Sequence, residues 1–166
     1  MSDAVQILLY PDPLFARRAE LRPVDEGMRN VGAALLATAR HHNAYGLAAT
    51  HIGALEPLIV VSVSSLDRRD YRLLFNPEIV SLSAEHASGA EGSVSMPGIE
   101  VDILRADSID LVFDDADGVR QAMTLEGFPA RVAQHEIDQM NGIFFLDRLS
   151  RLKRDAALRR FKKLSR

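Results

Sequence analysis

The sequence predicts a single α+β domain, residues 1–166, in which a central helix packs within curled antiparallel sheets and a further helix ends the chain. The length suits one domain with a core of its own. The middle of the chain alternates short β-branched and polar segments with turn signals, which indicates antiparallel strands. Helical periodicity is confined to three segments, two of them near the C-terminus.

The first third of the chain predicts an extended arm and one helix. Residues 5–10 read as a short strand or extended arm, which the prolines of PDP at 11–13 end. A helix is expected from Asp25 to Asn43, because acidic residues begin it, histidines end it, and its apolar positions recur with helical spacing. The segment AYGLAATHIGA at 44–54 is small and contains glycine, so its backbone can approach a ligand closely.

The central part predicts several strands. LIVVSVS at 58–64 is one strand, and YRLLFNPEIV at 71–80 is another that breaks at the turn Asn76-Pro77. Residues 81–104 are polar and rich in serine and glycine, with a turn at Met96-Pro97-Gly98, and we assign no strand to them. SIDLVFDD at 108–115 and VRQAMTLEGF, joined by a DADG turn, predict a hairpin.

The central helix is predicted over RVAQHEIDQMNG at 131–142. Pro129 suits its first turn, and Gly142 suits the left-handed position past its end. Helical spacing puts three polar groups on one side of it, facing a pocket, and other polar residues on the opposite side. The pocket side carries Val132, His135, Glu136, Gln139 and Ile143, and the other side carries Arg131, Asp138 and Asn141.

The C-terminal part is strongly basic. IFFLDRL at 143–149 is predicted as strand or extended coil, followed by a helix from Ser150 to Leu164. Its predicted apolar stripe consists of Leu152, Ala156, Ala157, Phe161 and Leu164. Nine lysines and arginines against one aspartate lie between Arg148 and Arg166, although the whole chain has a net charge of only −3. Such a segment either binds an acidic partner such as nucleic acid or forms a solvated basic surface.

Composition excludes several classes of site. The chain has no cysteine, so disulfides, thiolate metal sites and thiol nucleophiles are excluded together. The N-terminus lacks the pattern of a secretory signal, and no segment is apolar enough to span a membrane. We therefore expect a cytoplasmic protein with no membrane partner.

One motif on the central helix suggests chemistry. His135, Glu136 and Gln139 nearly form the His-Glu-x-x-His pattern of zinc hydrolases, in which two histidines one turn apart bind the metal. Gln139 replaces the second histidine, and a carboxamide is a weaker neutral ligand. The plain alternative is a hydrogen-bonded core histidine beside a glutamate that pairs with an arginine.

Three segments together resemble the signatures of the peptide deformylases, metallohydrolases that remove the formyl group from the N-terminal methionine of nascent bacterial proteins. They are AYGLAATH at 44–51, EGSVS at 91–95 and QHEIDQMNG at 134–142. ILLYPDPLF, NPEIV and FLDRLS also resemble the family, so the resemblance covers nearly the whole chain in order. It implies the family's α+β fold.

The resemblance implies a degenerate metal site. The family binds Fe²⁺ or another divalent ion through a cysteine and two histidines, whose positions correspond to Ser93, His135 and Gln139. Only His135 is a retained ligand type. A serine hydroxyl and a carboxamide supply no charge and bind such ions weakly, so we expect no metal, or weakly bound Fe, Zn or Ni.

The implied substrate side has changed as well. The glutamine that the family uses to bind the formyl oxygen corresponds to His51, and an arginine that helps to hold the peptide corresponds to Glu100. Gly46, Glu91, Arg105 and Glu136 are retained. Glu136 corresponds to the family's general acid/base, which works on a metal-bound water, so it does not restore the chemistry alone.

Several functions remain open on the sequence. In the first, hydrolysis is lost or strongly reduced, and the protein binds N-terminal peptide segments or an assembly partner. In the second, His51, His135 and Glu136 form a rewired metal site. In the third, Ser93 and His135 form a metal-free nucleophilic site, oriented by Glu91 or Glu136, with an oxyanion hole from backbone groups such as Val94 N–H. The basic C-terminal helix also resembles the helix by which some deformylases dock on the ribosome.

Overall fold

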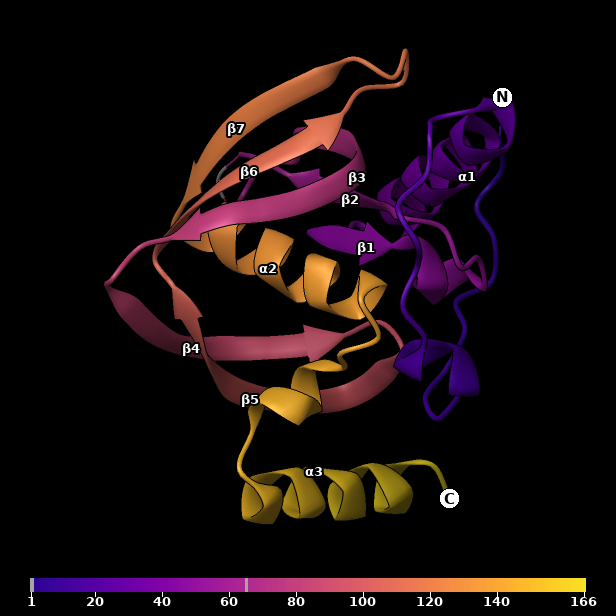
Figure 1. Cartoon of the computed structure of the whole chain (residues 1–166). Helices are drawn as coiled ribbons and strands as arrows, with labels where there is room; N and C mark the ends of the chain where they lie inside the picture. Colours follow the sequence, from indigo (N-terminus) through magenta and orange to yellow (C-terminus); the bar gives the residue numbers. More distant parts are fainter. Residues whose placement is uncertain (1, 65) are drawn as a thin grey trace.

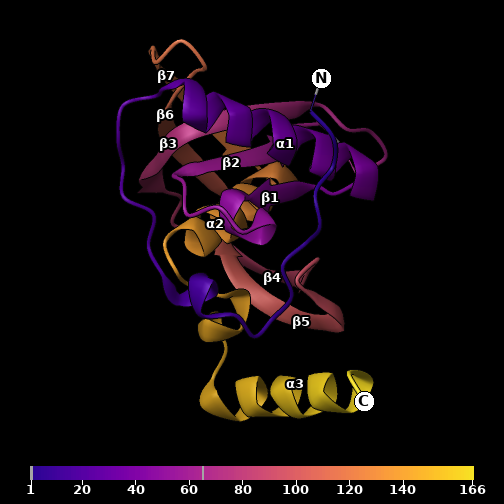
Figure 2. The ribbon, with the colours of Figure 1, turned by 90° about the vertical axis from the view of Figure 1, so that its right-hand side faces the viewer.

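The computed structural model describes residues 2–64 and 66–166 and shows one helix between two antiparallel sheets (Figure 1). Helix α2 (Phe128–Met140) lies between a five-stranded sheet, ordered β1-β2-β3-β6-β7, and the two-stranded sheet β4-β5. Helix α1 (Glu26–His42) packs against β1 and β2, and α3 (Arg151–Leu164) packs on β5 (Figures 1 and 2). The predicted α+β fold with a central helix and a C-terminal helix is confirmed.

The remaining elements are seven strands and three 3-10 turns within the described residues. The strands are β1 (Gly46–Ala48), β2 (Leu58–Ser62), β3 (Tyr71–Leu82), β4 (His86–Ser93), β5 (Met96–Ala106), β6 (Ser108–Asp114) and β7 (Arg120–Glu126). Single 3-10 turns occupy Pro13–Ala16, Ala49–Ile52 and Phe145–Arg148. The predicted hairpin of residues 108–128 is confirmed as β6-β7, and the first predicted helix is confirmed with Asp25 as its N-cap and Asn43 as its left-handed C-cap.

The break predicted at Asn76-Pro77 is wrong, because β3 continues through it. Asn76 has φ 50°, and the pairing of β3 with β6 shifts register between Phe75 and Glu78. The Asn76 side chain donates to Asp114 Oδ2 at 2.9 Å, which holds this bulge to the neighbouring strand. A bulge absorbs the proline and leaves the strand intact.

The serine- and glycine-rich segment 81–104, to which the sequence assigned no strand, forms most of the β4-β5 hairpin. Its pairing runs from His86 opposite Ala106 to Ser93 opposite Met96. Of the residues in β4, only Glu91 is buried, so the strand has no apolar alternation for sequence analysis to detect.

Aromatic packing replaces a strand after α2. Residues 145–148 form a 3-10 turn, and Phe144, Phe145 and Leu146 are buried. The rings of Tyr10 and Phe144 stack with centroids 4.8 Å apart. This packing also holds residues 5–10, which form an extended arm with isolated backbone bonds rather than a strand.

Helix α2 is anchored to both sheets. It begins at Phe128, three residues earlier than predicted, with Pro129 in the first turn, and Gly142 past its end has φ 79° as predicted. Ala130, Ala133 and Ile137 pack against the larger sheet. The Gln134 side chain bonds both backbone groups of Ala106, at 3.1 and 2.9 Å, and thereby fixes α2 on β5.

Helix α3 attaches to the domain through fewer residues than predicted. Leu152 is 78% exposed and Leu164 is 60% exposed, whereas Ala157 is buried and Phe161 packs against Tyr10. The predicted stripe is therefore wrong at Leu152, Ala156 and Leu164, which are exposed, and it lacks Leu158, which packs against the same cluster as Phe161. Among the described residues, no helix is long and apolar enough to cross a membrane.

Candidate functional site

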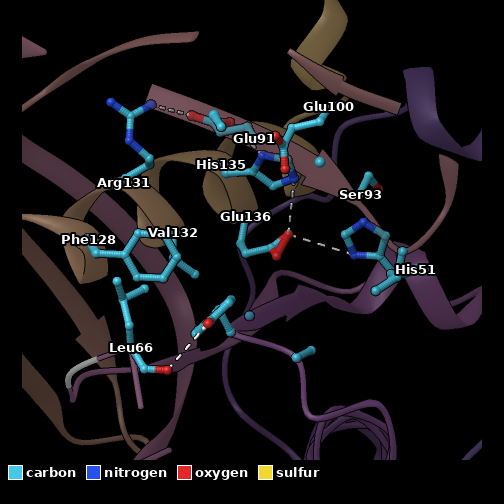
Figure 3. A pocket seen from close by; sticks show the side chains of 16 residues that line it. His51, Leu66, Glu91, Ser93, Glu100, Phe128, Arg131, Val132, His135 and Glu136 are labelled. Atoms are coloured by element: carbon cyan, nitrogen blue, oxygen red, sulfur yellow. Dashed lines mark hydrogen bonds and ion pairs between the residues drawn. The ribbon is translucent and has the colours of Figure 1, made fainter. Parts of the chain in front are cut away.

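A cavity of about 520 Å³ lies between β1, β4 and the first turns of α2 (Figure 3). A volume of this size suits a small ligand or the end of a peptide. Eight of the nine residues predicted for the site line it: Gly46, His51, Glu91, Ser93, Val94, Glu100, His135 and Glu136. The ninth, Gln139, is buried on α2 outside the cavity lining.

His135 is oriented by Glu91. Its Nδ1 donates to Glu91 Oε1 at 2.8 Å, so Nε2 is left on the side of Glu136, whose Oε1 is 3.9 Å away (Figure 3). Burial lowers the pKa of His135, but the nearby carboxylates of Glu136 and Glu91 outweigh burial and raise it above 6.5. The side chain therefore presents one free ring nitrogen to the cavity.

Glu91 is the hub of a buried ionic network. Arg105 binds it with two hydrogen bonds of 2.9 Å, and Arg131 adds a third at 2.8 Å. Burial raises the pKa of Glu91, but the bonds from Arg105 and His135 outweigh it and lower the pKa to about 2. Both carboxylate oxygens are engaged, so the structure uses Glu91 to hold His135.

The network continues through Asp138 behind the cavity. Arg105 donates to Asp138 Oδ2 at 2.6 Å, and Arg148 donates to both oxygens of Asp138, at 2.9 and 2.7 Å. Paired charges of this kind tolerate burial because each one is hydrogen-bonded. Arg105 therefore helps to orient His135, because it holds the Glu91 carboxylate that His135 binds. This role gives a structural reason for the retention of Arg105.

Arg131 lies on the cavity side of α2, and its predicted place on the opposite side is wrong. Side chains on a helix lean toward its N-terminus, and a long arginine can reach past its own turn. Arg131 donates to Glu91 and to the carbonyls of Ala87 and Ile103 on the facing hairpin. It therefore closes one wall of the cavity.

His51 is buried and neutral. Its Nδ1 accepts a hydrogen bond from Ala48 N–H at 2.9 Å, so Nε2 carries the proton and has no partner among the described residues. Burial lowers the pKa of His51 to about 3. Its Nδ1 lies 3.8 Å from Glu136 Oε1, which for a neutral ring is neither a hydrogen bond nor an ion pair.

Glu136 has a buried oxygen without a partner. The side chain is 3% exposed, and Oε1 accepts no hydrogen bond from the described residues. Burial raises the pKa of Glu136 to about 7, against the opposing effect of His135. Gly46 permits this packing, because a Cβ there would lie 2.6 Å from Val132 Cγ1 and 3.1 Å from Glu136 Cγ.

The donor set does not fit the divalent ion that the resemblance implies. Ser93 Oγ accepts from Ser95 N–H at 3.1 Å, and both amide atoms of Gln139 are buried with no partner in the part of the chain that the structure describes. Within residues 2–64 and 66–166, no three His, Cys, Asp or Glu side chains are grouped to hold a metal. Neutral hydroxyl and amide groups do not replace a thiolate and an imidazole.

Sequence reasoning missed the apolar wall of the cavity. Tyr45, Leu66 and Phe128 line it together with Val132, and the rings of Tyr45 and Phe128 meet edge to face with centroids 4.7 Å apart. Arg69 stacks over Tyr45 at 3.8 Å from the ring centroid. These residues come from three separate segments, so only tertiary packing brings them together.

The neutral state of His51 predicts a pH-dependent stability. The pKa of His51 is about 3 in the folded protein and 6.5 in the unfolded chain. The unfolded chain therefore binds a proton more readily, so the stability of the fold is complete above pH 6.5 and is lost as the pH falls toward about 3. We expect His51→Gln to lose less free energy of unfolding than the parent between pH 6.5 and 4.5, by up to about 1.4 kcal/mol per pH unit. Urea denaturation at several pH values measures this. His41→Gln, at an exposed histidine, should follow the parent, and equal pH slopes for His51→Gln and the parent would contradict the assignment.

This chain is similar in sequence to known proteins over most of its length. Residues 4–155 match the family model for polypeptide deformylase. A peptide deformylase-like protein of Rhizobium meliloti (strain 1021) is 41% identical over 96% of this chain and 92% of its own, and a peptide deformylase of the same strain is 34% identical over 95% and 91%.

Solved structures give the same result. The peptide deformylase of Ehrlichia chaffeensis in complex with actinonin has a TM-score of 0.90 and 31% identity over 100% of this chain and 99% of its own. The Met-Ala-Ser-bound peptide deformylase of Acinetobacter baumannii has a TM-score of 0.83 and 26% identity over 90% and 100%. The family match over most of the length establishes that the chain belongs to the polypeptide deformylase family.

Proposed function

We infer that this protein is a deformylase-family member whose metal-dependent hydrolysis is lost or strongly reduced and whose cavity binds N-terminal peptide segments. The observation that carries this proposal is the chemistry at the three family ligand positions. Ser93 offers a hydroxyl that already accepts a hydrogen bond, and Gln139 offers a buried neutral amide in place of an imidazole. His135 alone supplies a metal-binding nitrogen.

Glu136 has a pKa of about 7, which suits proton transfer, but the site offers no activated water from which it could take a proton. In the family, the metal supplies the activated water from which this glutamate takes a proton. Here Glu136 can hold or release a proton near neutral pH, and His135 lies beside it. Without an activated nucleophile, proton transfer alone accelerates amide hydrolysis little.

Binding is supported by the intact cavity and by the relatives. Related structures hold actinonin or the peptide Met-Ala-Ser in the same fold. Rhizobium meliloti has both a peptide deformylase and a peptide deformylase-like protein, and this chain is more similar to the second. We place this function in the cytoplasm, where nascent N-termini emerge.

A rewired metal enzyme is the second candidate. His51, His135 and Glu136 converge, with Glu136 Oε1 3.8 Å from one ring and 3.9 Å from the other. Against it, the His51 nitrogen that faces Glu136 is engaged by Ala48 N–H. The metal-free serine site has less support, because no hydrogen bond joins Ser93 to His135 in the described part of the chain.

Metal content is the decisive test of the proposed function. Protein purified anaerobically with added Fe²⁺, Zn²⁺ or Ni²⁺ should retain less than about a tenth of an equivalent, because the anionic ligand and one imidazole are missing. Elemental analysis measures this, with the Rhizobium meliloti peptide deformylase prepared in parallel as the control. A full equivalent together with hydrolysis of a formyl peptide would overturn the proposal. Loss of that metal in His51→Gln would then identify the rewired site.

A further inference from the structure

Two carboxylates at the cavity lack a basic partner. Glu136 has the unpaired buried oxygen described above, and Glu100 lies exposed at the rim. Arg160 reaches Glu100 but donates to its backbone carbonyl, at 3.3 Å, rather than to its carboxylate. Among the described residues, neither glutamate forms an ion pair with a lysine or an arginine. A buried polar atom without a protein partner can be satisfied by a bound water, an ion or a ligand group.

The neighbouring guanidiniums cannot supply this partner. The hydrogen bonds of Arg105 and Arg148 all go to Glu91 or Asp138. Arg131 donates to Glu91 and to backbone carbonyls of the β4-β5 hairpin. None of these three guanidiniums is left to pair with Glu136, so a cation that meets this carboxylate comes with a ligand.

The cavity floor also offers a hydrogen-bond donor. His51 Nε2–H is buried with no partner among the residues that the structure describes, and Nδ1 of the same ring lies 3.8 Å from Glu136 Oε1. A ligand that donates to the carboxylate and accepts from the imidazole would satisfy both groups. The first residue of a peptide has this arrangement, because its ammonium and its carbonyl oxygen are attached to adjacent carbon atoms.

The opposite wall is apolar and suits a hydrophobic side chain. Tyr45, Leu66, Phe128 and Val132 line it, so an apolar group that enters beside them leaves water. The cavity thus combines an apolar wall with carboxylates at its floor and rim (Figure 3).

We propose that the cavity selects free, positively charged peptide N-termini with an apolar first side chain over formylated N-termini. The inference rests on the proposed binding function and specifies its ligand. Formylation removes the charge of the amino group, so a formylated peptide keeps one N–H donor but loses the charge-assisted attraction to the carboxylates. Glu100, which stands where the resemblance places an arginine, is the specificity-determining residue at the rim.

Calorimetric titration with Met-Ala-Ser and N-formyl-Met-Ala-Ser, in the presence of a chelator, tests this. We expect the free peptide to bind at least about tenfold more tightly, the usual value of one charge-assisted hydrogen bond. Glu100→Gln should reduce that preference about tenfold and leave the affinity for the formyl peptide nearly unchanged. Glu126→Gln removes an exposed carboxylate outside the cavity and should retain the full preference.

A second variant protects the test from a folding defect. Glu136→Gln should also weaken the free peptide selectively, and its unfolding midpoint shows whether the fold is intact. Equal or tighter binding of the formyl peptide to the parent overturns the selectivity and leaves the binding function standing. Binding of neither peptide overturns both.

Discussion

The double variant Ser93→Cys with Gln139→His is expected to bind close to one equivalent of divalent metal, where the parent binds almost none. The rest of the site is already in place, because Glu91 directs His135 Nε2 into the cavity and Glu136 lies beside it. A thiolate and a second imidazole, one helical turn from the first, complete a three-ligand set. Elemental analysis after anaerobic purification with Fe²⁺ or Ni²⁺ measures the gain.

Hydrolysis of a formyl peptide should recover only in part in this variant. His51 offers a single N–H in place of the amide that the family uses, and Glu100 brings an unpaired carboxylate to the rim. A misplaced donor costs on the order of a hundredfold in rate. Full activity from the two changes alone would show that His51 and Glu100 do not obstruct the reaction.

A matched control separates a rebuilt site from adventitious binding. Ser88→Cys with Gln121→His introduces the same two residue types at exposed positions on different strands, outside the cavity lining. It should bind no more metal than the parent. Metal uptake by the control at the level of the cavity variant would mean that the added thiol and imidazole bind metal wherever they stand.

The sequence predicted those elements whose residues carry a periodic or capping signal. Helix α1 was predicted within one residue at each end, because Asp25 and Asn43 mark its boundaries. The β4-β5 hairpin was missed because β4 buries only Glu91 and so shows no apolar alternation, and the alternation of Ile99, Val101 and Ile103 in β5 lies within a segment that was assigned as polar. Asn76-Pro77 misled because a bulge, which depends on pairing with β6, lets a strand accommodate proline.

In the site, too, the sequence predicted the residues but not their tertiary contacts. Motif positions predicted which polar residues would meet, and eight of nine line the cavity. Their hydrogen bonds could not be predicted, because the acceptor role of His51 Nδ1 depends on Ala48 N–H and the orientation of His135 depends on Glu91. The reach of Arg131 to the opposite hairpin is likewise a property of the assembled sheets.

Removal of three basic side chains from α3 should abolish most of the salt-sensitive affinity for ribosomes, if this helix docks on ribosomal RNA. Arg159, Lys162 and Lys163 are exposed and have no ion-pair partner among the described residues. Each phosphate contact adds about 0.9 to the slope of log affinity against log salt. Between about 50 and 200 mM salt, the parent should therefore lose about fortyfold more affinity than the variant with all three changed to glutamine.

Co-sedimentation with ribosomes across the salt series measures this difference. The exposed ends of α3 favour docking through this helix. Leu152 and Leu164 are largely exposed and only Ala157 is buried, so the helix presents most of its circumference to a partner. The control changes three exposed arginines elsewhere to glutamine: Arg18, Arg40 and Arg68. This control loses as much positive charge as the α3 variant. If the ribosome contact is local to α3, the control should keep the steep salt dependence of the parent. Identical salt slopes for all three proteins would instead make the helix a solvated basic surface and remove the ribosome as a partner.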